Sequence, residues 1–254
     1  MTSQQEIKQF ASLKLPKYRQ KYGQFLVEGR KVVEEVFHSD LHVVRILFTS
    51  EYAQKHGVGD NWDQISSKDM QKISQFDTPP GVVAVVEIPK SMPFQPQAGL
   101  NLILDGISDP GNLGAILRIA DWYGISQVLL SEDCVDVYNF KCLSASMGSF
   151  LRVQTSRVDL EAWLKSQQNG SSSLEPVVYG AYLNGTSIYE VTPPEQPYFL
   201  VIGSEAHGIR EGLKSLINSP ITIPARGGAE SLNASVATAI LIDRLMVNIH
   251  RNTR

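Results

Sequence analysis

Five short apolar runs after residue 99 constrain the fold of this 254-residue chain more than any other feature. They lie at 100–104, 128–130, 177–179, 199–202 and 221–223. Each run is continuous rather than alternating, which is typical of strands buried on both faces of a parallel sheet. Helical patterns lie between the runs, at 112–123, 159–168 and 233–250. The sequence therefore predicts an α/β fold with a parallel sheet covered by helices.

A proline-rich segment divides the chain into two expected domains. Residues 89–99 contain three prolines and no apolar periodicity, which is typical of a linker. Upstream of it, strand patterns alternate with helical patterns, which predicts a small α/β domain over residues 1–96. Its strands are expected at 24–27, 43–49 and 82–87, and its helices at 3–13, 30–38 and 68–74. The larger domain is expected over residues 97–254, with a mobile polar loop at 167–173.

Size and composition exclude several classes of protein. The hydrophobic content of 43% suits a packed globular core, and no run approaches the roughly 18 apolar residues of a membrane helix. The first residues, Met-Thr-Ser-Gln-Gln-Glu, do not show the pattern of a signal peptide. Cys134 and Cys142 are the only cysteines, without CxxC or histidine at ligand spacing, so we expect neither disulfides nor a metal site. A reduced, cytoplasmic protein is expected.

The N-terminal part is basic, although the whole chain carries a net charge of −3. Between residues 8 and 31, Glu28 is the only acid among seven lysines and arginines, and four aromatic residues are interleaved. Cations attract phosphates and aromatic faces stack on unpaired bases, which predicts RNA binding. A solvated helix face with core aromatics is the alternative, and composition alone favours it. The residues expected to contact RNA are Lys14, Lys17, Arg19, Lys21 and Arg30.

Three polar loops follow predicted strands of the larger domain. They are Asp-Pro-Gly-Asn-Leu-Gly at 109–114, Gly-Ser-Glu-Ala-His-Gly at 203–208, and a segment at 223–235 that ends in Ser-Leu-Asn-Ala-Ser. Glycines let a ligand approach the backbone, and helix starts offer free N–H groups. Three such loops in one domain predict one composite binding site.

Each polar residue of these loops also has a purely structural interpretation. Asn112 is a good N-cap, Glu205 suits the start of a helix, and Ser231 or Asn233 could cap the last helix. Arg118 could extend into solvent or pair with Asp121, or it could hold a phosphate in its planar fork.

A dinucleotide site is the second interpretation of the first loop. A strand, a glycine turn and a helix are followed by Glu132 and Asp133, near the place of a ribose-binding acid. The spacing of Gly106, Gly111 and Gly114 does not form GxGxxG, which disfavours NAD.

Together the three loops resemble a known family. Asn112-x-Gly114-x-x-x-Arg118, Gly203-x-Glu205-x-x-Gly208 and Ile223-Pro224 followed by Ser231-Leu-Asn-x-Ser235 resemble, in order, three motifs of the SpoU/TrmH family of RNA ribose 2′-O-methyltransferases, of the SPOUT class. The resemblance covers about residues 100–250, and Cys-Leu-Ser-Ala-Ser-Met-Gly-Ser at 142–149 resembles the family's segment between motifs. Residues 22–35 resemble, less specifically, a small substrate-binding domain that many members carry. Ala206 and His207 depart from the small residues usual in the second motif.

The resemblance implies a fold, a cofactor and an assembly. The catalytic domain would have a deep trefoil knot at its C-terminal end, would use S-adenosylmethionine, and would form a homodimer with the site near the subunit interface. The residues implied in cofactor binding are Ala181, Tyr182, Gly203, Ser204, Glu205, Gly208, Ile223 and Leu232. Ala181 and Tyr182 are expected in the loop after their strand.

The resemblance also implies a catalytic set. It consists of Arg118, Asn112, Glu205 and Asn233, with Ser231 and Ser235 as lesser candidates. An arginine pKa above about 12 makes Arg118 a poor base, so we expect it to hold an RNA phosphate and stabilise the developing alkoxide. Ribosomal RNA is the expected substrate. A transfer RNA methyltransferase, or a non-catalytic RNA-binding protein of the same fold, is the alternative.

Overall fold

The computed structural model describes residues 2–168 and 176–251 and consists of two compact units. The first contains Met1–Lys90 and Asp136–Leu151, and the second contains Ser91–Val135 and Arg152–Arg254. Most of the loop predicted at 167–173 lies outside the described residues. In the parts that are described, no helix has the length and apolarity that a membrane span needs.

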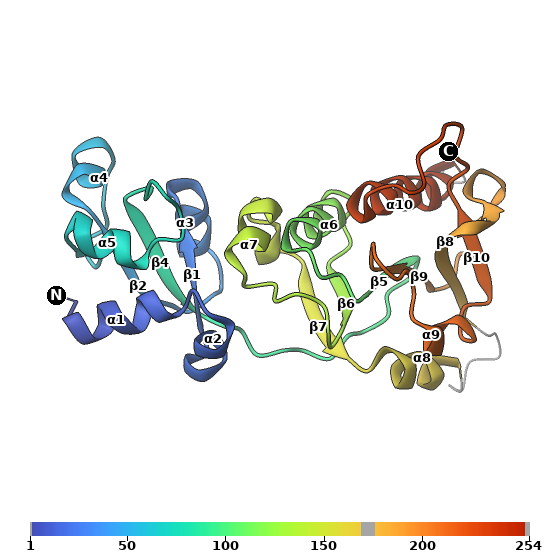
Figure 1. Cartoon of the computed structure of the whole chain (residues 1–254), viewed down its shortest axis with the longest axis horizontal. Coiled ribbons are helices and arrows are strands. Elements are labelled where there is room, and N and C mark those ends of the chain that lie inside the picture. Colours follow the sequence, from blue (N-terminus) through green and yellow to red (C-terminus); the bar gives the residue numbers. More distant parts are fainter. Residues whose placement is uncertain (1, 169–175, 252–254) are drawn as a thin grey trace. The chain divides into compact units, whose positions relative to one another are not determined.

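The first unit is built on a four-stranded sheet of order β1-β4-β2-β3 (Figure 1). Its strands are β1 (Gln24–Glu28), β2 (Val43–Phe48), β3 (Asp63–Gln64) and β4 (Val82–Glu87), and its first helices are α1 (Gln4–Ser12), α2 (Pro16–Tyr22), α3 (Arg30–Phe37), α4 (Ser50–Lys55) and α5 (Ser67–Ile73). Strand β4 runs antiparallel to β1 and β2, and alternate residues of β4 enter two different hydrophobic clusters. Helices therefore cover both faces of this sheet.

A later segment of the chain completes the first unit. Helix α7 (Phe140–Ser146) and the short helix η1 (Ser149–Leu151) belong to it. Leu143 packs in the cluster of Phe25, whose ring lies 4.5 Å from that of Tyr138. The prediction placed this segment within a continuous domain over 97–254. Its apolar side chains pack instead against β1, a contact that sequence order cannot show.

The second unit contains the predicted parallel sheet. All of its strand pairs are parallel, in the order β10-β8-β9-β5-β6-β7. The strands are β5 (Leu100–Asp105), β6 (Gln127–Ser131), β7 (Gln154–Val158), β8 (Val177–Ser187), β9 (Tyr198–Gly203) and β10 (Ser219–Thr222). Strand β7 was not predicted, because this edge strand is mostly polar and only its Ser156 is buried.

Helices cover both faces of the parallel sheet. Figure 1 shows α6 (Pro110–Trp122) and α10 (Ala234–Arg251) on one face, and α8 (Leu160–Gln168) and α9 (Glu211–Lys214) on the other. Because Asp105 at the end of β5 pairs with Gly203 at the end of β9, the first two polar loops leave the sheet side by side. The α/β prediction with a parallel sheet is confirmed, and the trefoil knot stays a prediction.

Candidate active site

The start of α6 presents Asn112 to the site. Asp109, not Asn112, is the N-cap: its side chain accepts the backbone N–H of Asn112 at 2.8 Å, and Pro110 occupies the first turn. The structural interpretation of Asn112 as N-cap is therefore wrong. Its amide side chain is left for other partners.

One hydrogen-bonded chain joins the three polar loops. The Nδ2 of Asn112 donates to the Oε1 of Glu205, and its Oδ1 accepts from the Nδ2 of Asn233 at 2.9 Å. The Oδ1 of Asn233 accepts from the hydroxyl of Ser235 at 2.6 Å and from the backbone N–H of Ser235 at 3.0 Å. Asn233 thus also caps the start of α10. Four of the six predicted catalytic residues meet in one network.

The second loop is closed on itself by its own backbone. Ser204 and Gly208 exchange two N–H···O=C hydrogen bonds, of 3.1 and 2.9 Å. A Cβ atom at Gly203 would lie 2.2 Å from the carbonyl carbon of Gly208, so only glycine fits there. The tight closure leaves Glu205 exposed in the loop, where it reaches Asn112.

A buried carboxylate anchors the residue that follows this loop. Asp105, at the end of β5, is 2% exposed and accepts the backbone N–H and the Nε of Arg210 at 2.8 and 2.5 Å. Arg210 also reaches Asp133 at 2.7 Å. The hydroxyl of Ser131, followed by the contact with Arg210, lowers the pKa of Asp133. Sequence reasoning missed Asp105 and Arg210, although an acid that ends an apolar strand is a usable signal.

Arg118 and Ser231 do not join the network. Arg118 lies six residues beyond Asn112 in α6, about 9 Å along the helix axis. It is exposed, and within residues 2–168 and 176–251 no hydrogen bond or ion pair holds it. The acid considered as its partner, Asp121, pairs with Arg152 at 2.8 Å instead. The guanidinium of Arg118 is therefore available to a ligand.

The residues implied in cofactor binding surround the ends of the central strands. Ala181 and Tyr182 belong to β8 rather than to a loop after it. Residues 181–185 lie between the pairs Gly180–Pro220 and Thr186–Ile221 and have no register partner in β10, although the carbonyl of Leu183 accepts the hydroxyl of Thr222 at 3.0 Å. Ile223 directly follows β10, and Leu232 is 47% exposed beside Asn233.

The chemistry of this set suits S-adenosylmethionine. Exposed apolar side chains and open main chain can receive an adenine, and burial raises the pKa of Tyr182, so its hydroxyl stays neutral. Glu205 is the one charged residue of the implied set, and its negative sign complements a sulfonium cation.

The basic N-terminal residues divide into two groups. Lys17, Lys21 and Arg30 are exposed, and the ammonium groups of Lys17 and Lys21 lie 4.9 and 5.2 Å from the ring centres of Tyr18 and Tyr22. Lys14 is half-buried, and Phe10 and Phe25 belong to the core. The exposed face of α2 therefore keeps the predicted cations and aromatic rings.

Arg19 is the exception. It is 2% exposed, its Nη1 donates to the carbonyl groups of Leu13 and Lys14 at 2.9 and 3.0 Å, and its Nη2 pairs with Asp136 at 2.7 Å. The prediction that Arg19 contacts RNA is therefore wrong. This guanidinium instead ties α2 to the segment that carries α7.

Comparisons with known proteins agree with this site. The profile of the SpoU rRNA Methylase family matches residues 99–243, and that of the MRM3-like substrate binding domain matches residues 4–84. A 23S rRNA guanosine 2′-O-methyltransferase of Bacillus subtilis is 30% identical over 95% of this chain and 96% of its own. A solved structure from Porphyromonas gingivalis, assigned to the TrmH family, is 37% identical with a TM-score of 0.81, covering 96% of this chain and 98% of its own.

The same fold occurs in a structure solved with the cofactor. A SpoU methyltransferase from Streptomyces viridochromogenes in complex with S-adenosylmethionine has a TM-score of 0.81 and 23% identity, over 99% of both chains. The family match covers more than half of this sequence, and all three polar loops lie inside it. The chain therefore belongs to the SpoU rRNA methylase family.

Proposed function

We propose that the protein transfers a methyl group from S-adenosylmethionine to a ribose 2′-hydroxyl of ribosomal RNA. The observation that carries this proposal is the hydrogen-bonded chain from Glu205 through Asn112 and Asn233 to Ser235, which unites the polar residues of all three family motifs. Membership of the family confirms the predicted enzyme class and cofactor.

The residues of the network position the substrate. When bound, the cofactor supplies a methyl group that its sulfonium already activates, so the protein must mainly align the attacking oxygen. Asn112 and Asn233 are fixed by each other and by Glu205 and can orient a ribose without reorganising. Arg118, held by no described residue, binds the adjoining phosphate and stabilises the alkoxide that develops on the 2′-oxygen.

Ribosomal RNA is favoured over transfer RNA by the extent of the similarity. Relatives named as rRNA methyltransferases align over both units, including the Bacillus subtilis enzyme and a human mitochondrial one that matches 89% of this chain. A solved structure titled for methylation of transfer RNA covers only 61% of it, with a TM-score of 0.53. This chain therefore shares the substrate-binding unit with relatives named as ribosomal RNA methyltransferases, and this shared unit favours ribosomal RNA as the substrate.

The predicted division of labour is part of the proposal. Residues 1–96 bind substrate RNA through the exposed Lys17, Lys21 and Arg30, and the part of residues 97–254 that forms the second unit holds the catalytic site. A cytoplasmic location is part of the proposal, because Cys134 and Cys142 are both buried and form no disulfide in the part of the chain that the structure describes.

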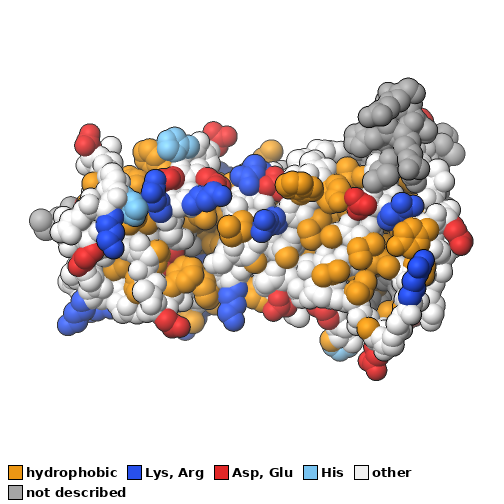
Figure 2. Space-filling view, turned by 90° about the horizontal axis from the view of Figure 1, so that it is seen from above, with side chains coloured by type: hydrophobic (Ala, Val, Ile, Leu, Met, Phe, Trp, Pro, Cys, Tyr) orange, Lys and Arg blue, Asp and Glu red, His pale blue; other side chains and the backbone are white. Residues whose placement is uncertain are grey.

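A homodimer is proposed from exposed apolar side chains on the second unit. Trp122 of α6 is 84% exposed and Val236 of α10 is 47% exposed. Figure 2 shows apolar side chains gathered over this part of the surface. Burying them against a second copy removes apolar area from water. Light scattering or analytical ultracentrifugation tests this, and Trp122→Glu is expected to yield monomers.

Radiolabelled methyl transfer tests the reaction. Total RNA from a strain lacking this protein is incubated with labelled S-adenosylmethionine, separated into ribosomal and transfer fractions, and digested to nucleosides. We expect label in a 2′-O-methylnucleoside of ribosomal RNA. Arg118→Ala should abolish turnover and keep cofactor affinity. RNA binding without label in any fraction, also on assembled subunits, would favour the non-catalytic alternative.

A further inference from the structure

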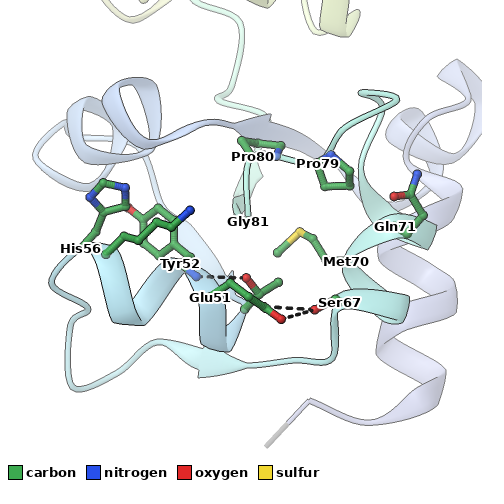
Figure 3. Close-up of a pocket in the computed structure, with 11 residues that line it drawn as sticks. Glu51, Tyr52, His56, Ser67, Met70, Gln71, Pro79, Pro80 and Gly81 are labelled. Carbon is green, nitrogen blue, oxygen red and sulfur yellow. Dashed lines mark hydrogen bonds between the residues drawn. The ribbon is translucent and has the colours of Figure 1, made fainter.

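A pocket of about 430 Å³ lies in the first unit, separate from the catalytic network. It opens at the carboxyl end of β2, between α4, α5 and the turn that precedes β4 (Figure 3). Its size is that of a site for a small organic group.

The walls of the pocket offer flat surfaces. The rings of Tyr52 and His56 lie 4.9 Å apart, and Figure 3 shows Pro79 and Pro80 bordering the same space, with the side chain of Met70 at its base. Gly81 has φ +80°, and a Cβ there would come within 3.1 Å of Tyr52. The Pro-Pro-Gly turn is thus held close to α4. Tyr52 is only 5% exposed and supports the wall from behind, whereas the more exposed His56, Pro79 and Pro80 offer the surfaces that suit a stacked aromatic ring.

One edge of the pocket carries a fixed carboxylate. Glu51 accepts the hydroxyl hydrogen of Ser67 at 3.1 and 3.2 Å to its two oxygens. Its own backbone N–H, followed by Ser67, lowers the pKa of Glu51, so it is ionised near neutral pH. A carboxylate has about four acceptor positions, so most stay free for a ligand with adjacent donors. Guanine presents such a pair on its Watson–Crick edge, N1–H and the N2 amino group.

Two cations stand at the rim. Lys55 lines the pocket, and the Nη1 of Arg30 lies 3.3 Å from the Nδ1 of His56. Arg30 is exposed and also forms an ion pair with Glu34, on the surface, at 2.8 Å. Such surface pairs are weak, so Arg30 can exchange Glu34 for a phosphate. Stacking walls, an acceptor and rim cations together match one nucleotide of single-stranded RNA.

We propose that this pocket binds an unpaired guanine of the RNA substrate, with its edge on Glu51 and its flanking phosphates on Arg30 and Lys55. The proposal rests on the proposed function, because it supposes that the first unit handles RNA. It adds recognition of a base to a unit whose proposed RNA binding otherwise depends on lysine and arginine side chains that contact phosphates. It also assigns that recognition to a different unit from the one that contains the catalytic network.

Fluorescence polarisation with the full chain tests the pocket. Four labelled hexanucleotides are compared: UUUGUU and the same RNA with inosine, adenosine or an abasic residue in place of guanosine. Inosine lacks only the N2 amino group. We expect the guanosine RNA to bind about tenfold more tightly than the others. Glu51→Gln should remove this preference and leave inosine binding unchanged. Lys55→Ala should weaken all four equally and reduce the salt dependence.

The matched control is Lys165→Ala, which removes an exposed, ion-paired lysine from α8 of the second unit and should change nothing. Equal binding of guanosine and abasic RNA, or a preference that survives Glu51→Gln, would overturn the proposal. Methyl transfer to ribosomal RNA is measured in parallel. A wild-type protein that methylates but shows no guanine preference refutes the pocket alone. A guanine preference without methyl transfer supports the pocket and refutes the proposed reaction.

Discussion

Gly203→Ala probes how the second loop shapes the site. The new Cβ would lie 2.2 Å from the carbonyl carbon of Gly208 and 2.4 Å from the nitrogen of Ile209. Carbon atoms in contact need about 3.5 Å, so the returning backbone must move by about 1.3 Å. Both neighbours are backbone atoms, so no side-chain rotation can relieve the clash.

The expected cost follows from the contacts that this shift breaks. The two hydrogen bonds between Ser204 and Gly208, of 3.1 and 2.9 Å, would exceed bonding distance. At about 1 kcal/mol each, the free energy of unfolding falls by about 2 kcal/mol, and Tm by about 4–8 °C. Glu205 moves away from Asn112, and a misplacement of about 1 Å costs about 100-fold in turnover.

Calorimetry and single-turnover methyl transfer measure these two effects. Gly228→Ala is the matched control, because a Cβ there meets no atom within 4 Å and its φ is not positive. We expect the control to keep the wild-type Tm. A Gly203→Ala protein with wild-type Tm and turnover would refute the inference that this loop must close tightly.

Three further outcomes are expected. Asn112→Ala should lower single-turnover methyl transfer by about 10²-fold with an unchanged Tm, since it removes the centre of the network; full turnover would contradict that role. Arg19→Ala should lower the free energy of unfolding, measured in urea, by about 2–3 kcal/mol, because Asp136 loses its partner. Lys21→Ala, at an exposed lysine, should weaken RNA binding and leave the free energy of unfolding unchanged. Burial raises the pKa of Glu28 above 4.5, so the folded state holds this proton more tightly. The contribution of Glu28 to stability should therefore fall as pH rises from about 4.5 toward 7. We expect the difference in urea midpoint between the wild type and Glu28→Gln to change in that direction over this pH range.

Local burial could be predicted from the sequence because it leaves a periodic pattern. The continuous apolar runs correspond to β5, β6, β8, β9 and β10, each within a few residues except β8. That strand continues to Ser187 through a stretch without register partners in β10, and its residues, Gly-Ala-Tyr-Leu-Asn-Gly at 180–185, form no continuous apolar run. The three motifs were visible because short glycine-containing loops keep their polar residues at fixed spacing.

By itself the sequence determined which segments are buried, which loops are polar, and therefore the family. Only the tertiary structure decided which side chains meet. Asn112 lies 93 residues from Glu205 and 121 from Asn233, and strand order and register bring them together. The sequence groups Arg19 with the surface cations, whereas Asp136, 117 residues away, holds it in the interior. Hydrophobic periodicity shows which side of a helix or strand a residue occupies. The residue that it contacts across the fold is decided by long-range packing, which no local sequence pattern records.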